Sequence, residues 1–156
     1  MPMLNLFDKI FHNDKGDVVV EFAAALPLLL LLSLGMTEIA RAIMQANTVE
    51  KGMRAAAVYA ARSNNPTSGQ ALINITNIAK TGTIDGSGAV LVSGWSLSDA
   101  SLSVSEVTYN LDGTNIPVIR LNASVPFDPI VPGLMDFFGL EGYRINLSHE
   151  QAFIDN

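Results

Sequence analysis

The chain has 156 residues, enough for one modest domain and an appendage. Its net charge is −6, and no basic patch interleaved with aromatic residues is present, which argues against nucleic acid as a partner. Cysteine is absent, so disulfides, thiolate chemistry and cysteine-ligated zinc sites are excluded.

The first feature along the chain is an apolar run at 18–37, with the sequence VVVEFAAALPLLLLLSLGMT. About 20 residues at 1.5 Å each span the roughly 30 Å hydrocarbon core of a bilayer. The run is apolar all round, as a lipid-facing helix should be, and membrane helices tolerate a proline such as Pro27. The run therefore predicts one membrane-spanning helix, with the lipid bilayer as a partner.

Glu21 is the exception within this run. A carboxylate inside an apolar span costs at least about 2.5 kcal/mol, so an ionisable residue there suggests a function. Alternatively, Glu21 sits at the membrane interface, where the cost is smaller. The residues alone leave both interpretations open.

The basic residues near the span do not settle its direction. Lys9 and Lys15 precede it, whereas Arg41, Lys51 and Arg54 follow it. Taken alone, this count favours a C-terminus on the cytoplasmic side.

A cleavable secretory signal is a rival interpretation of the same run. Ala40-Arg41-Ala42 resembles a small-x-small cleavage pattern behind the apolar stretch. Against it, the stretch exceeds the roughly 7–15 residues of a typical signal core and contains Glu21.

The helical pattern continues beyond the apolar run. Asn64, Asn65 and Pro66 form a stop signal, so we expect one helix from about Asp17 to Arg62, on the order of 70 Å long. Its second half has a stripe of apolar residues recurring every three or four positions, comprising Ile39, Ala42, Ile43, Ala46, Val49, Met53, Ala56, Ala57 and Ala60.

The remaining residues predict a small α+β domain. Thr67 and Gln70 fit a capping box that opens a short amphipathic helix ending near Lys80, and a turn-rich loop follows. Asp112-Gly113 is a hairpin signal, and Trp95 is expected in the core. Alternating apolar and polar residues predict an antiparallel sheet of three or four strands, at about 89–95, 102–111, 115–127 and 143–154. We expect one face of this sheet to pack on the amphipathic half of the long helix.

Residues suited to catalysis are not clustered in the sequence. His12 and His149 lack a metal-ligand spacing, and no phosphate-binding loop or nucleophile elbow occurs. We therefore expect no enzymatic activity, catalytic residue, cofactor, metal or small-molecule substrate.

The segment 15–22, KGDVVVEF, resembles the processing site of type IV prepilins. The resemblance implies that a membrane prepilin peptidase cuts after Gly16, which makes Asp17 the first mature residue. Glu21 then occupies the position of the family's glutamate, which implies a role in assembly: its carboxylate pairs with the freed amine of a mature N-terminus. Such pairing removes the penalty of an isolated buried charge.

The match is closest to the TadE-like family, the pseudopilins of the tight-adherence (Flp) pilus. The residues that carry this resemblance lie at 20–27, 35–41, 53–61 and 125–132. It implies a pseudopilin or minor pilin needed to assemble an adhesive Flp-type pilus, with other pilins or pseudopilins and the inner-membrane assembly platform as partners. It also implies an inner-membrane location, with the N-terminus in the cytoplasm and the C-terminal domain outside.

The resemblance divides the chain into four parts. They are a leader at 1–16, a transmembrane half-helix at 17–37, its amphipathic continuation at 38–65 and an exported domain at 66–156. The alternative function is an uncleaved, signal-anchored envelope or surface binding protein that never enters a pilus.

Overall fold

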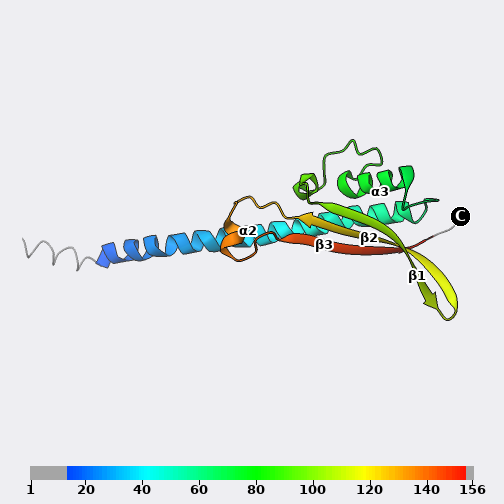
Figure 1. Ribbon diagram of the computed structural model, residues 1–156. Coiled ribbons are helices and arrows are strands. Elements are labelled where there is room, and N and C mark those ends of the chain that lie inside the picture. The colour runs from blue at the N-terminus through cyan, green and yellow to red at the C-terminus, as the bar shows by residue number, and fades with distance from the viewer. Residues whose placement is uncertain (1–13, 154–156) are drawn as a thin grey trace, which may run out of the picture. The chain divides into compact units, whose positions relative to one another are not determined.

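The computed structural model of the protein describes residues 14–153 (Figure 1). In chain order the elements are α2 (Asp14–Ala60), α3 (Gly69–Thr81), the 3-10 helix η1 (Ser93–Ser96), β1 (Ser101–Leu111), β2 (Thr114–Pro126), α4 (Leu134–Phe137) and β3 (Arg144–Ala152). The chain divides into two compact units at the bond between Ile39 and Ala40. The predicted class, a long N-terminal helix with a small antiparallel sheet and a short helix, is confirmed. The predicted leader lies mostly at residues 1–13, outside the described part.

The first unit contains the apolar part of α2. The helix continues through Pro27, which lies inside it. The Thr37 hydroxyl donates a hydrogen bond to the carbonyl oxygen of Ser33 at 2.9 Å. This bond satisfies a polar side chain within the helix itself, as an apolar environment requires.

The second unit is built on a three-stranded antiparallel sheet in the order β1-β2-β3. Leu111 pairs with Thr114, so Asp112 and Gly113 form a two-residue turn with φ of 49° and 85°. Both residues therefore have the positive φ of a type I′ hairpin turn, which confirms the predicted hairpin.

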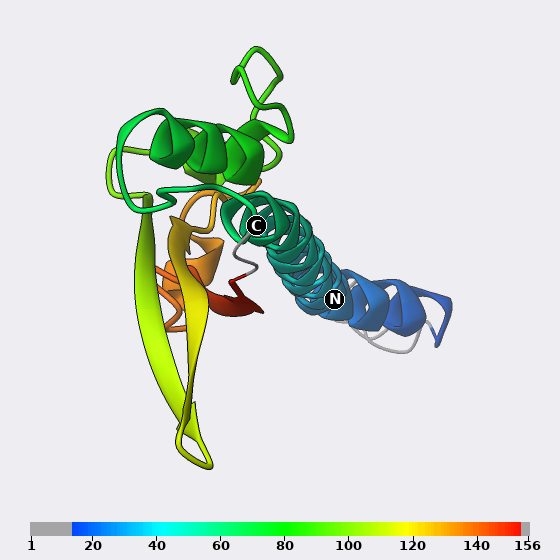
Figure 2. The same ribbon diagram turned by 90° about the vertical axis from the view of Figure 1, so that its right-hand side faces the viewer.

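The core of this unit lies between the sheet, α3 and the part of α2 after Ala40. Figure 2 shows α3 and the sheet against different sides of this part of the helix. The sheet contributes the alternate residues of β2 that were predicted to face inward, and Trp95 is buried as expected. The buried cluster comprises Val49, Met53, Ala56, Ala57, Ala60, Ile75, Ile78, Ala79, Val92, Trp95, Ile119, Leu121, Ala123, Val125 and Ile145.

The predicted apolar stripe of the long helix is buried only in its later part. Val49, Met53 and Ala60 are fully enclosed, whereas Ile43 and its neighbour Met44 are exposed. The core of the second unit therefore covers the helix from about Val49 onward.

The predicted strand at 89–95 is wrong. This segment is a loop that ends in η1. The Leu91 amide donates to the Lys80 carbonyl oxygen at 2.7 Å, so the segment completes the end of α3 instead of a sheet edge. At Gly94, a Cβ would lie 2.1 Å from the Pro126 carbonyl oxygen, which shows that the backbone crosses directly over the end of β2.

The predicted capping box is also wrong. The short helix is present, but its N-cap is Ser68, with no hydrogen bond from the side chain. The Thr67 hydroxyl instead contacts the Asn65 side-chain oxygen at 3.4 Å. Because the helix begins at Gly69, Thr67 is one residue too early to act as the cap.

Candidate functional site

The predicted processing site lies near the start of the described part of α2. Gly16 is the third residue of the helix, and a Cβ built on it has no atom within 4 Å. Glycine is about 1 kcal/mol less favourable than alanine in a helix, so Gly16 weakens α2 locally next to the Gly16–Asp17 bond.

Glu21 lies one turn further along α2. It is four residues after Asp17, and residues at this spacing are neighbours on the helix surface. Its side chain is exposed, and none of the side chains described in the structure pairs with its carboxylate. An ionised carboxylate inside an apolar span is costly unless it is paired.

The surface around Glu21 is apolar on every side of the helix. Of the described helices, the one from Val18 onward is long and apolar enough to cross a membrane. Ala23, Ala24 and Ala25 follow Glu21 and are also exposed. The large exposed apolar residues of this stretch are Val18, Val19, Val20, Phe22, Leu26, Leu28, Leu29, Leu30, Leu32, Leu34 and Met36. This surface suits contact with lipid or with other apolar helices, with small residues that allow close approach.

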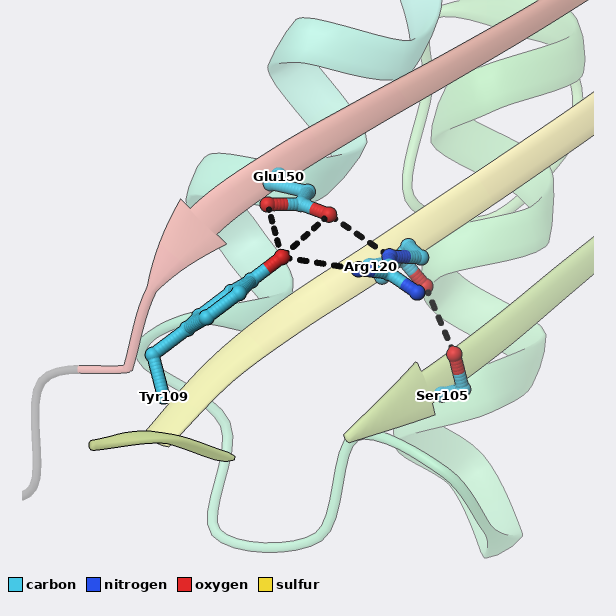
Figure 3. A network of polar contacts seen from close by, with 4 residues as sticks. All are labelled: Ser105, Tyr109, Arg120 and Glu150. Carbon is cyan, nitrogen blue, oxygen red and sulfur yellow. Dashed lines mark hydrogen bonds and ion pairs between the residues drawn. The ribbon is translucent and has the colours of Figure 1, made fainter. Parts of the chain in front are cut away.

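The second group of polar residues is on the sheet face that points away from the core. Figure 3 shows Tyr109 of β1, Arg120 of β2 and Glu150 of β3 meeting across the three strands. The Arg120 Nε donates to Glu150 Oε1 at 2.6 Å and Nη2 donates to the Tyr109 hydroxyl at 2.8 Å. The Tyr109 hydroxyl donates to the Glu150 carboxylate at 3.1 Å.

These contacts fix the charges of the group. The hydrogen bond from Arg120 lowers the pKa of Glu150, and that bond likewise raises the pKa of Arg120. Glu150 is thus held ionised and Arg120 protonated near neutral pH. The ion pair and the Tyr109 hydroxyl together join the three strands of the sheet.

The sequence did not reveal this group. The alternation placed Arg120 and Glu150 on the polar face of their strands, but their contact depends on the pairing register, which sets Arg120 opposite Glu150.

A shallow hollow of about 360 Å³ lies beside the group and is lined mainly by small polar residues, namely Ser101, Ser103, Asn122, Ala123, Ser124, Asn146, Leu147 and Ser148.

In residues 14–153, no three His, Cys, Asp or Glu side chains come together to form a possible metal site. His149 is half-buried in β3, opposite Leu121 of β2. His12, the other histidine, lies outside the described residues.

Comparison with known proteins identifies a family match at the start of the described chain. Residues 16–58 match the family model described as TadE-like protein. The match begins at the predicted cleavage glycine, contains Glu21 and confirms the resemblance over these residues. No curated protein and no solved structure matches the chain.

Proposed function

From the TadE-like match at residues 16–58, we propose that the chain is a membrane-anchored pseudopilin or minor pilin that helps to assemble a Flp-type pilus for adherence. The observation that carries the proposal is the coincidence of this match with a continuous helix whose first part is apolar and exposed on all sides. Such a helix can be held in a bilayer and then transferred into a bundle of similar helices, because both environments are apolar.

In this proposal, a prepilin peptidase cuts after Gly16. The glycine itself supports this step, since Gly16 weakens α2 locally and so lowers the cost of presenting the bond to the enzyme. Cleavage leaves Asp17 as the N-terminus, with a new positive charge four residues from Glu21.

Assembly then depends on Glu21 and the alanines beside it. A freed amine, from this or a neighbouring subunit, supplies the positive partner that the Glu21 carboxylate lacks among the described side chains. Ala23, Ala24 and Ala25 let another helix approach closely, which matters because lipid gives no hydrophobic drive for helix association. The partners are other pilins or pseudopilins and the inner-membrane platform.

The proposed orientation has the N-terminus in the cytoplasm and the domain after Ala40 outside. We also propose that the protein is not an enzyme. Its proposed role is structural, because the chain joins a membrane anchor to a folded domain.

Substitution of Glu21 tests the assembly role. We expect Glu21→Ala and Glu21→Gln to leave membrane insertion intact and to reduce pilus number about tenfold or more, since losing one partner of a buried charge pair costs roughly 2–5 kcal/mol. Pili are counted by electron microscopy and insertion by membrane fractionation. Leu28→Ala, at another exposed position of the same helix, is the matched control and should assemble normally. Normal pilus numbers in both Glu21 variants would disprove the role of the glutamate.

A further inference from the structure

The connection between β2 and β3, residues 127–143, forms one end of the second unit. It lies at the end of the sheet opposite the Asp112–Gly113 turn and is drawn mainly in orange in Figure 1. The Arg41 guanidinium donates to the Asp128 carbonyl oxygen at 3.5 Å, so the connection touches α2 where the helix enters this unit. The apolar run ends near Thr37, four residues before Arg41, or about 6 Å along a helix axis. The residue of α2 that this connection contacts is therefore about one helical turn along the chain from the end of the apolar run.

The connection has a buried side and an exposed apolar side. Leu134 and Met135 of α4 point into the unit and are 7% and 9% exposed. Phe137 and Phe138 are 70% and 46% exposed, and their rings pack edge to face at 5.4 Å. Further large apolar or aromatic residues are exposed in the same connection, namely Ile130, Leu140 and Tyr143.

Backbone contacts hold this surface in place. The Phe127 amide donates to the Tyr143 carbonyl oxygen at 3.0 Å, which closes the connection where it leaves the sheet. The Leu140 amide donates to the Met135 carbonyl oxygen at 2.8 Å, which fixes the turn after α4. The exposed rings therefore belong to a preformed surface, and binding through them costs little ordering.

We propose that residues 127–143 form a lipid-docking surface, with Phe137 and Phe138 inserted into the interfacial layer of the bilayer. Aromatic residues concentrate at this depth in membrane proteins, and a short apolar face lies in the interface when the surrounding chain is polar. The inference requires only that the anchor is in a membrane, and it does not depend on cleavage or pilus assembly.

The charge of the connection selects the type of lipid. Residues 127–143 contain Asp128, Asp136 and Glu141 and no lysine or arginine. Anionic headgroups repel these carboxylates at low ionic strength, within a Debye length of about 10 Å at 0.1 M salt. The surface therefore docks on a zwitterionic bilayer and detaches from the headgroups of a strongly anionic one.

Tryptophan quenching tests the docking directly. The full chain is reconstituted in phosphatidylcholine vesicles with or without bromine on the acyl chains, and Phe137→Trp is compared with Tyr109→Trp on β1. Wild type, with its single buried Trp95, gives the background signal. We expect brominated lipid to quench the added tryptophan of Phe137→Trp at least threefold more than that of Tyr109→Trp. Phe138→Trp should behave as Phe137→Trp does, and circular dichroism verifies the fold of each variant.

Lipid composition and protein density give the remaining outcomes. Replacing about a third of the lipid by phosphatidylglycerol should reduce the quenching of Phe137→Trp at low salt, and added salt should restore it. Equal quenching at positions 137 and 109 would overturn the proposal. So would weak quenching of position 137 at a low ratio of protein to lipid that falls further as this ratio rises, because a second copy of the chain would then cover the rings.

Discussion

At the scale of single residues, Gly94 marks the tightest contact between η1 and the sheet. Its missing side chain lets the backbone pass over β2, where a Cβ would lie 2.1 Å from the Pro126 carbonyl oxygen and 2.7 Å from Val125 Cγ1. We expect Gly94→Ala to destabilise the second unit by about 1–3 kcal/mol, the usual cost of overpacking a core. Denaturation of the full chain in detergent micelles measures the change. Ser93→Ala, at the exposed neighbouring position, should stay within about 0.5 kcal/mol of wild type, and equal effects of the two variants would contradict this packing.

Glu150 gives a prediction about pH at the same scale. Because Arg120 lowers its pKa in the folded state, the interaction stabilises the protein above the ordinary glutamate pKa of about 4.3. That stabilisation is lost as the pH falls through the lowered pKa. The melting temperature of wild type should therefore exceed that of Glu150→Gln most near neutral pH, and the difference should close on acidification to about pH 3. A difference that is constant or widens over this range would contradict the assigned pairing. Glu141→Gln, an exposed carboxylate outside the strands, serves as the control.

At the scale of elements, the Asp112–Gly113 turn sets the register of β1 on β2. Gly113 has φ of 85°, a conformation that costs a β-branched residue about 1–2 kcal/mol or more. We expect Gly113→Val to lower the free energy of unfolding by at least this amount, measured by chemical denaturation. Asp112→Asn should be nearly neutral, because asparagine tolerates the positive φ of 49° at that position. Retention of full stability in Gly113→Val would show that the turn does not control the register.

The elements that the sequence predicted correctly are those with a clear period. Alternation along 119–125 gave the inward face of β2, and the three-to-four-residue spacing gave the buried stripe after Val49. The strand prediction for 89–95 was wrong although its apolar, β-branched residues suit a strand. Tertiary contacts with Lys80 and Pro126 instead hold this segment as a loop that ends in η1. The Tyr109–Arg120–Glu150 group depends on contacts across three strands, which no local pattern contains.

At the scale of the whole molecule, one helix serves two environments. Its first part presents apolar side chains in every direction, and from about Val49 it buries one stripe against α3 and the sheet. The candidate site residues Gly16, Asp17 and Glu21 were predicted from a local motif, and this prediction is still to be tested. Their proposed roles involve a peptidase and other subunits, so these roles follow from the motif and the family match and not from contacts inside the chain.

The most direct measurement is the N-terminal sequence and intact mass of the protein purified from native membranes, with and without the prepilin peptidase. We expect a chain that begins at Asp17 when the peptidase is present and keeps its leader when it is absent. A chain that keeps Met1 in both strains would contradict processing and favour the uncleaved envelope binding protein. A start near Ile43 would contradict the anchor itself, because the apolar helix would then be a secretory signal.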